Sequence, residues 1–417
     1  MSTPRKVITK DKVGILLLAL ILYDTLSATK KRFEPIRQGE VRMFVCGPTV
    51  YDSTHLGHAR TFIVYDVLAR YLRSKGFKVF FVMNLTDIED KIFEKAKREK
   101  TSYQEIAQRY TEEFKEALRE LNVETVSLLA RASDYLDTAV SQISRMLSNG
   151  SAYIVEGNVY FDTSTFPEYG KLSHQSPLEI MLRRIEPTPE KKNQADFFLW
   201  RRIDEHPSWD SPFGKGRPGW HIEDTAISIS NLGQRYDIHG GGLELVFPHH
   251  EAEIAQAEAL TGAKPFVNYW VHTGLLKVKG RKMSKSLGNY ILVKDLLKKY
   301  DASTIRILCL STHYRKDINF SERALAKASN QTNEIAKALI VLQKRARGSK
   351  SYLERVLNIE KKFYRFMDND LDAPKAIFSL LTLVKLVNAR LENFDSESWE
   401  NAKRTIGAMC KILGIVI

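Results

Sequence analysis

The stretch VRMFVCGPTVYDSTHLGHARTFIVYDVLARYLRSKGFKVFFVMN, Val41–Asn84, decides the fold. Its first residues, Val41–Cys46, alternate and run into a glycine and a proline, which predicts a strand that enters a loop. Arg60–Lys75 carries apolar residues at helical spacing and is closed by a glycine, and Val79–Asn84 follows as a buried strand. This order predicts a βαβ unit. Because ligands bind at the carboxyl ends of parallel strands, the loop at Pro48–His58 is a candidate functional segment.

Sheet signals return much later, at Tyr236–His239 and Val267–Val278, with a helix predicted over Ala252–Leu260 between them. Ser151–Asp210 is mixed, and helical periodicity dominates after Ser321. We therefore predict an α/β protein with a split Rossmann-like (HUP-type) parallel sheet, an inserted subdomain and an α-helical C-terminal domain. The predicted boundaries are 1–120 for the first half of the sheet domain, 121–215 for the insertion, 216–320 for the second half, and 321–417 for the helical domain.

Composition is typical of a globular protein, with 43% hydrophobic and 27% charged residues in 417. The apolar run Val13–Tyr23, behind a basic start, suggests either a secretory signal or a buried first element, and we expect the latter. No stretch reaches the roughly 18 apolar residues of a membrane span. Three cysteines, Cys46, Cys309 and Cys410, form no disulfide framework. A cytoplasmic protein that does not bind membranes is therefore expected.

The formal net charge of +13 is the strongest compositional signal. A basic excess of this size attracts polyanions, among which nucleic acid is the first candidate. A solvated, lysine-rich surface without a nucleic-acid partner would have the same composition.

The histidine loop, His55-Leu56-Gly57-His58, opens the predicted helix. Helix N-termini bind anions through their free N–H groups and the positive end of the dipole. Gly57 allows a nucleotide to approach the backbone, and both histidines can donate hydrogen bonds to phosphate. A chance pair or a metal-binding pair would show the same spacing.

The lysine loop, Lys282-Met283-Ser284-Lys285-Ser286-Leu287-Gly288-Asn289, has two lysines and two serines next to glycines. Such a loop suits a triphosphate, because the lysines would neutralise charge that develops on leaving pyrophosphate. An exposed basic turn is the alternative.

Together the two loops resemble the HIGH and KMSKS signatures of class I aminoacyl-tRNA synthetases. The resemblance implies attack of an amino-acid carboxylate on the α-phosphate of magnesium-bound ATP, in which positioning and charge stabilisation do most of the work. It assigns catalytic roles to His55, His58, Lys282 and Lys285, and ATP binding to the histidine loop with Gly57 and to Lys285.

A third set of residues suggests a metal site. Cys46 ends the first predicted strand, and His249 and Glu253 are four residues apart, so one helical face presents both. A cysteine, a histidine and a carboxylate that converge on strand ends are a plausible zinc site. Each of them alone is more typical of an ordinary buried polar residue.

The segments Phe44–Arg60, Pro218–Asp224 and Asp237–Gln256 resemble the cysteinyl-tRNA synthetase family. In that family zinc is held by two cysteines, a histidine and a glutamate, and it binds the substrate thiol directly, which discriminates against serine. The resemblance places the ligands at the following positions: Cys46, Asp224, His249 and Glu253. Asp224 departs from the family, since it replaces the second cysteine and makes the site harder. The resemblance also places Trp220, Thr86 and Asp87 near substrate cysteine and His239, Gly240, Gly241 and Gly242 near adenosine.

The expected activity is that of a cysteine–tRNA ligase, with ATP, L-cysteine and tRNA(Cys) as partners. By resemblance the insertion meets the acceptor stem, and basic residues such as Arg323 and Lys327 of the helical domain contact the tRNA backbone. The usual anticodon-reading domain is expected to be missing after Ile417. Two alternatives remain open: a cysteine ligase for a small amino-sugar acceptor of the mycothiol type, and a non-catalytic synthetase paralogue. A monomer or dimer is expected.

Overall fold

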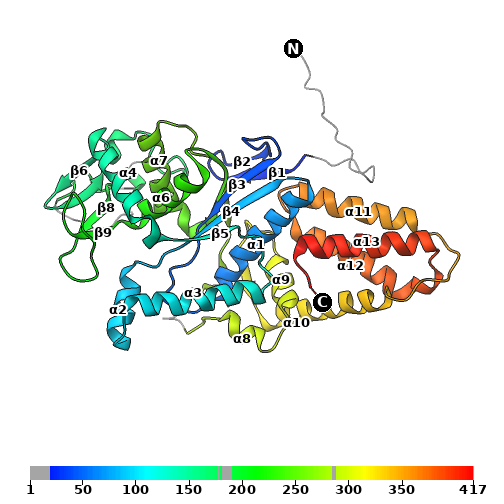
Figure 1. Cartoon of the computed structure of the whole chain (residues 1–417). Helices are drawn as coiled ribbons and strands as arrows, with labels where there is room; N and C mark the ends of the chain where they lie inside the picture. Colours follow the sequence, from blue (N-terminus) through cyan, green and yellow to red (C-terminus); the bar gives the residue numbers. More distant parts are fainter. Residues whose placement is uncertain (1–18, 177, 181–189, 284–287, 417) are drawn as a thin grey trace, which may run out of the picture.

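A computed structural model describes residues 19–176, 178–180, 190–283 and 288–416 of the chain. Its centre is a parallel sheet in the order β11–β10–β3–β4–β5. Figure 1 labels three of these strands, β3, β4 and β5, in the middle of the molecule. The strands span Glu40–Val45 (β3), Lys78–Leu85 (β4), Leu128–Arg131 (β5), Tyr236–Gly242 (β10) and Val267–Thr273 (β11). Met43 of β3 pairs with Ile238 of β10, so the two halves of the sheet join at the first strand. The prediction of a split parallel sheet is confirmed.

The βαβ unit contains α1 (Leu56–Ser74), which covers one face of the sheet. The helix begins at Leu56 rather than at Arg60, because His55 caps its N-terminus and accepts a hydrogen bond from the backbone N–H of His58. Gly76 follows the helix with a positive φ of +91°, a backbone conformation that glycine adopts without steric cost. The histidine loop therefore forms the first turn of α1.

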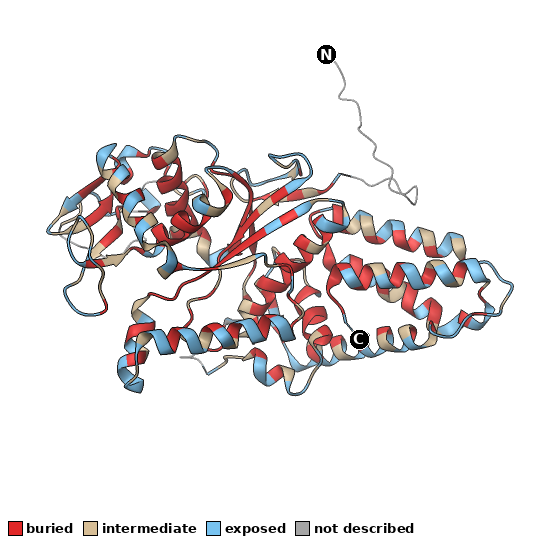
Figure 2. Cartoon of the chain, viewed as in Figure 1, coloured by how far each residue is buried: buried red, intermediate tan, exposed pale blue. Residues whose placement is uncertain are grey.

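Alternation along β3 sends successive side chains to two different cores. Met43 and Val45 belong to the core around α1, whereas Phe44 and Cys46 belong to the core around α6 (Trp220–Leu232) on the opposite face. Figure 2 shows that the buried residues concentrate on the sheet and on the faces of the helices that cover it. Cys46 thus points toward the helix that carries Asp224.

An antiparallel sheet in the order β6–β7–β8–β9 is inserted in the sequence between β5 and β10. Its strands span Ala152–Val155 (β6), Asn158–Phe161 (β7), Phe197–Arg202 (β8) and Gly216–Pro218 (β9). It packs with α4 (Leu136–Ser148) and α6 on the side of the parallel sheet opposite the C-terminal helices (Figure 1).

The segment Val267–Val278 is not one strand. It divides at Gly274 and Leu275 into β11 of the parallel sheet and β12 (Leu276–Val278) of a small separate sheet in the order β13–β12–β14. The partners of β12 are β13 (Arg281–Lys282) and β14 (Ile318–Phe320). The chain can turn here because residue 274 is a glycine: a Cβ at this position would lie 2.5 Å from the backbone carbonyl carbon of Lys316. The small sheet leads directly into the lysine loop.

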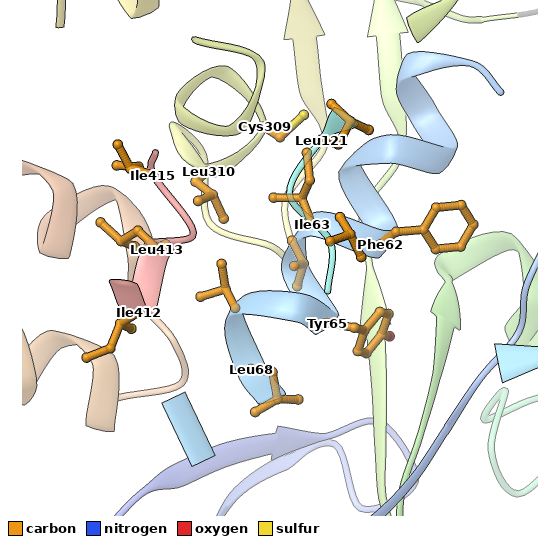
Figure 3. Packing of buried hydrophobic residues seen from close by; sticks show 14 of the residues in the cluster. Phe62, Ile63, Tyr65, Leu68, Leu121, Cys309, Leu310, Ile412, Leu413 and Ile415 are labelled. Carbon is orange, nitrogen blue, oxygen red and sulfur yellow. The ribbon is translucent and has the colours of Figure 1, made fainter. Parts of the chain in front are cut away.

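The C-terminal region is helical, as predicted, and packs against α1 through α9 and α13. Figure 3 shows Ile63 and Leu68 of α1 beside Cys309 and Leu310 of α9 and beside Ile412, Leu413 and Ile415 at the C-terminal end. The helices span Ala302–Leu310 (α9), Glu322–Val341 (α10), Leu353–Asp368 (α11), Ala373–Arg390 (α12) and Ser396–Leu413 (α13).

The other elements connect these layers or pack against them. They are β1 (Ile21–Asp24), β2 (Thr29–Arg32), α2 (Asp90–Glu99), α3 (Tyr103–Glu120), α7 (Glu251–Thr261) and α8 (Val293–Leu297), with short helical turns at Ala132–Tyr135, Thr163–Thr165, Leu243–Leu245, Val246–His250 and Leu391–Asn393. Among them α7 is almost entirely buried. Of the apolar run Val13–Tyr23, residues 13–18 lie outside the described residues, and its end forms β1 as a partly buried strand. Within the described ranges, no helix is long and apolar enough to span a membrane.

Candidate active site

The histidine loop is held rigidly at the start of α1. His55 Nδ1 accepts a hydrogen bond from the backbone N–H of His58 at 3.2 Å, and the two imidazole rings stack with centroids 3.6 Å apart. Burial lowers the pKa of His58 to about 4, so this imidazole is neutral at pH 7. Its Nδ1 is buried and makes no hydrogen bond within the described part of the chain. His58 is therefore a neutral group with unused hydrogen-bonding capacity.

Residues after the lysine loop are bonded to the histidine loop. The backbone N–H of Leu56 donates to Ile291 O at 2.9 Å, and that of Val293 donates to Thr54 O at 3.0 Å. A Cβ added to Gly57 would lie 2.9 Å from the His55 ring and 3.4 Å from the Met283 methyl carbon. Gly57 thus leaves room at the point where the two loops meet.

Both loops border one cavity of about 320 Å³. It is lined by Cys46, Gly47, Pro48, Thr49, His55, Gly57, His58, Thr61, Phe62, Trp220, Gly242, Glu244, Leu245, Gly274, Leu275, Leu276 and Met283. Of the predicted catalytic lysines, Lys282 contributes its backbone to β13, and Lys285 lies outside the described residues. The cavity joins the histidine loop, the start of the lysine loop and Cys46.

The four predicted metal ligands lie close together, and one of them, Cys46, borders this cavity. Cys46 Sγ lies 3.3 Å from Asp224 Oδ2, and His249 Nε2 lies 3.0 Å from the same oxygen and 3.2 Å from Glu253 Oε1. One potential donor atom from each of the four residues lies within 4.8 Å of all the others. His249 belongs to an irregular turn before α7, yet its spacing from Glu253 still brings both side chains together. The predicted cluster exists as a geometric unit.

Charge in the cluster is poorly compensated by the protein itself. Both carboxylate oxygens of Glu253 are buried, and neither accepts a hydrogen bond from the described residues. Burial, together with the nearby charge of Asp224, raises the pKa of the Glu253 carboxyl well above its usual value. Burial, Asp224 and Glu253 likewise raise the pKa of the Cys46 thiol, which donates to Asp224. A buried carboxylate without a hydrogen-bond partner is energetically costly, whereas a cation beside Glu253 would compensate its charge. The residues therefore fit a divalent metal ion.

Neighbouring polar side chains orient the cluster. Asn84 Nδ2 donates to Asp224 Oδ1 at 2.6 Å, and Asn84 Oδ1 accepts from the backbone N–H of Gly47 at 2.6 Å. His221 Nδ1 lies 2.8 Å from His249 Nδ1, which leaves His249 Nε2 directed at the two carboxylates. Such outer partners fix the rotamer and tautomer of metal ligands.

Sequence reasoning missed the part that His250 takes in this cluster. Its Nε2 lies 3.1 Å from Cys46 Sγ, and its Nδ1 lies 2.8 Å from His272 Nε2. With Cys46, His239 and Glu253 it forms a second group of potential ligands. The adjacent pair His249-His250 was the available signal, but the sequence does not show that the irregular turn directs both rings inward.

The remaining predicted site residues divide between the cavity and the core. Trp220 borders the cavity and stacks on His249 with ring centroids 4.2 Å apart. Thr86 is buried beside Asn84, and Asp87 accepts hydrogen bonds from the backbone N–H and the hydroxyl of Ser133. Neither Thr86 nor Asp87 borders this cavity.

The glycines of β10 are explained by packing as well as by access. A Cβ on Gly240 would lie 2.3 Å from the Tyr65 ring, and one on Gly241 would lie 2.8 Å from Leu245. The ring nitrogen Nε2 of His239 lies 3.6 Å from Cys46 Sγ, and His239 is fully buried. Of the predicted adenosine-binding residues, Gly242 alone borders the cavity.

Comparisons with known proteins agree with this geometry. Residues 32–330 match the family of class I (C) tRNA synthetase catalytic domains, and residues 362–417 match the DALR domain. A cysteine–tRNA ligase of Caldicellulosiruptor saccharolyticus is 40% identical over 95% of this chain and 87% of its own length. One from Persephonella marina is 43% identical over 89% of this chain and 78% of its own.

Solved structures support the fold. The methionyl-tRNA synthetase of Mycobacterium tuberculosis with methionyl-adenylate has a TM-score of 0.64 at 16% identity, covering 90% of each chain. A leucyl-tRNA synthetase of Agrobacterium radiobacter has a TM-score of 0.65 at 9% identity, covering 92% of this chain and 85% of its own. At such identities the likeness concerns the fold, while the sequence matches define the group. The chain belongs to the cysteine–tRNA ligase family of class I tRNA synthetases.

Proposed function

We propose that the chain activates cysteine with ATP and transfers it to the 3′ end of tRNA(Cys). The observation that supports this most directly is the shared cavity, which brings the histidine loop and Met283 of the lysine loop next to Cys46 of the potential metal cluster. ATP bound against the two loops would have its α-phosphate close to an amino acid held at the cluster. Such an arrangement lowers the barrier through positioning.

Zinc is the metal that we propose for the cluster, held by Cys46, Asp224, His249 and Glu253. The donor set of sulfur, imidazole nitrogen and carboxylate oxygen is one that zinc accepts. When bound, zinc would take the substrate thiolate as a further ligand and so favour cysteine over serine. Trp220, stacked on His249 at the cavity wall, would enclose the amino acid.

The adenylation chemistry rests on the loops. His58 is neutral at pH 7, and its Nδ1 has no hydrogen-bond partner among the described residues. When this nitrogen carries the proton, it can donate a hydrogen bond to a phosphate oxygen. N–H groups at the first turn of α1 favour the negative charge of the triphosphate, and magnesium would accompany the nucleotide. We propose Lys282 and Lys285 as the groups that stabilise charge developing on pyrophosphate.

The C-terminal helices offer a surface for the tRNA backbone. A groove of about 750 Å³ between α10 and α12 is lined by Arg323, Lys327 and Lys385, with Asn330 and Gln331 among its polar residues. Lysine and arginine neutralise phosphates without reading sequence. With the excess of 63 basic over 50 acidic residues, this groove supports tRNA as the acceptor.

Two assays test the proposal. Exchange of labelled pyrophosphate into ATP is expected to require cysteine and to stay at background with serine. The activated cysteine is then offered either to tRNA(Cys) or to a glucosamine-inositol acceptor, and only the tRNA is expected to be acylated. Acylation of the amino-sugar alone would support the small-molecule ligase. Absence of cysteine-dependent exchange with intact ATP binding would support the non-catalytic paralogue.

Asp224 provides a prediction about the metal. Asp224→Cys is expected to raise zinc affinity by about tenfold, because it adds a second soft ligand at unchanged ligand charge. Asp224→Asn is the matched control and is expected to lower the affinity, since the amide keeps the shape and loses the charge. Zinc titration with a competing chelator measures both. Equal affinities of the original protein and both variants would show that residue 224 does not ligate the ion.

A further inference from the structure

Arg60 is a buried cation two residues after the histidine loop. Its side chain lies in α1 at 1% exposure, and no carboxylate lies within ion-pair distance of it in the described part of the chain. Instead its two terminal nitrogens donate hydrogen bonds to backbone carbonyls at 2.5–3.3 Å. The acceptors are the carbonyl oxygens of Gly274, Leu275, His313, Tyr314 and Lys316. An unpaired buried arginine is costly unless such acceptors satisfy it.

These carbonyls belong to two segments that carry the lysine loop. Gly274 and Leu275 connect β11 to β12, and β12 pairs with β13, where the lysine loop begins. The other three acceptors lie in the loop between α9 and β14, and β14 pairs with β12 on its other side. One guanidinium therefore attaches both of these segments to α1.

The far end of the lysine loop is tied to the same helix by the backbone. Leu56 N donates to Ile291 O, and Ile291 N donates to Met283 Sδ at 3.3 Å. The lysine loop is thus attached to the first turns of α1 both before and after its lysines. On the N-terminal side of the lysine loop, Arg60 attaches α1 to the turn between β11 and β12. The hydroxyl groups of Thr61 in α1 and Thr273 at the end of β11 lie 2.9 Å apart and add a further hydrogen bond.

We propose that Arg60 is a positioning residue that sets the small sheet β13–β12–β14, and with it Met283 at the start of the lysine loop, against the histidine loop. One nitrogen of the guanidinium bonds the β11–β12 turn and the other bonds the α9–β14 loop. These two segments are also bonded to each other, by Gly274 N–H to Tyr314 O at 2.7 Å and by Ile318 N–H to Leu275 O at 2.9 Å, so the fork fixes the joined pair against α1. A lysine would keep the charge but lose the fork, because a single ammonium cannot reach both segments in this geometry. The inference rests on the proposed function, in which one ATP binds against both loops.

Arg60→Lys tests this role by cysteine-dependent pyrophosphate exchange. The variant is expected to lower kcat by about 10- to 100-fold per folded molecule, because small misplacements of reacting groups have effects of that size. The KM for cysteine is expected to change by less than about threefold, because Arg60 makes no hydrogen bond to Cys46 or Trp220 on the opposite part of the cavity wall. A role in folding alone would lower the folded fraction and leave kcat per folded molecule unchanged.

Arg306→Lys is the matched control. Arg306 is also fully buried and donates to three carbonyls, those of Leu121, Asn122 and Leu413, but it pairs with Asp66 in the middle of α1, away from both loops. This variant is expected to lose thermal stability and to keep kcat per folded molecule within about twofold. An equal loss of kcat in both variants, or none in Arg60→Lys, would overturn the inference. An unsubstituted protein without exchange would instead contradict the proposed function.

Asp317→Ala gives a second test if Arg60→Lys does not fold. Asp317 accepts from the backbone N–H of Leu275 at 2.9 Å and pairs with Lys277 at 2.7 Å, so it supports the same junction from its exposed side. Removal of this partly exposed carboxylate is expected to lower kcat about threefold at unchanged KM. An unchanged kcat would count against a positioning role of the junction.

Discussion

Cys46→Ser is expected to abolish stable zinc binding and to lower kcat/KM for cysteine more than about 100-fold. Loss of an outer partner of a metal ligand already lowers affinity by about 10- to 100-fold, so loss of a ligand is expected to lie at or beyond that range. The serine hydroxyl cannot replace a thiolate as a soft ligand, and it leaves the buried carboxylates of Asp224 and Glu253 without a cation. Metal analysis of protein purified without chelator, together with cysteine-dependent exchange, measures both effects.

Cys309→Ser is the control for this substitution. Cys309 is as buried as Cys46 but lies in α9 within the apolar core, where burial raises the pKa of the thiol to about 12. Its replacement is expected to lower thermal stability and to leave the zinc content unchanged. Full zinc occupancy in the Cys46 variant, with selectivity for cysteine intact, would show that Cys46 is not a ligand on which metal binding or substrate selection depends.

Lys285→Ala is expected to slow formation of the adenylate by about 100- to 1000-fold. The expectation comes from the sequence of the lysine loop, since a cation that acts on charge developing in the transition state contributes effects of this size. Binding of cysteine is expected to change by less than about threefold, because the site that we propose for cysteine is the metal cluster and not the lysine loop. Single-turnover adenylation and cysteine binding measured on the same preparation separate the two quantities.

Lys279→Ala is the matched control for that variant. Lys279 is an exposed lysine on the turn between β12 and β13, close in sequence to the lysine loop. Its removal changes the net charge equally and is expected to leave adenylation within about twofold. Equal losses of cysteine binding and adenylation in Lys285→Ala would contradict a transition-state role.

The sequence predicted the parallel sheet well, because buried strands and the amphipathic α1 have local patterns. The start of α1 was predicted four residues late, since capping by His55 is a side-chain contact that hydrophobic spacing does not report. The division of Val267–Val278 was not predicted either. It depends on Gly274 packing against Lys316, a contact between segments distant in sequence.

The site was predictable where single motifs carry it and less so where distant side chains meet. The four ligand positions came from resemblance, and the structure brings their donor atoms together. The parts of Asn84 and His250 were missed, because an asparagine at a strand end and the second of two histidines have no local signature. Arg60 was missed for a similar reason. Its acceptors are backbone carbonyls, which sequence patterns cannot identify.

The placement of β3 between β4 and β10 has a consequence for biosynthesis. A nascent chain that has been synthesised only as far as the insertion can pair β3 with β4. The hydrogen-bonding groups on the other edge of β3 still lack their partner strand, β10. The hydroxyl of Tyr65 in α1 also lacks its hydrogen-bond partners at that stage, because these are Gly241 of β10 and Val271 of β11. An open strand edge of this kind promotes association between chains. We therefore expect the N-terminal half of the sheet to complete its packing only after β10 and β11 have been synthesised.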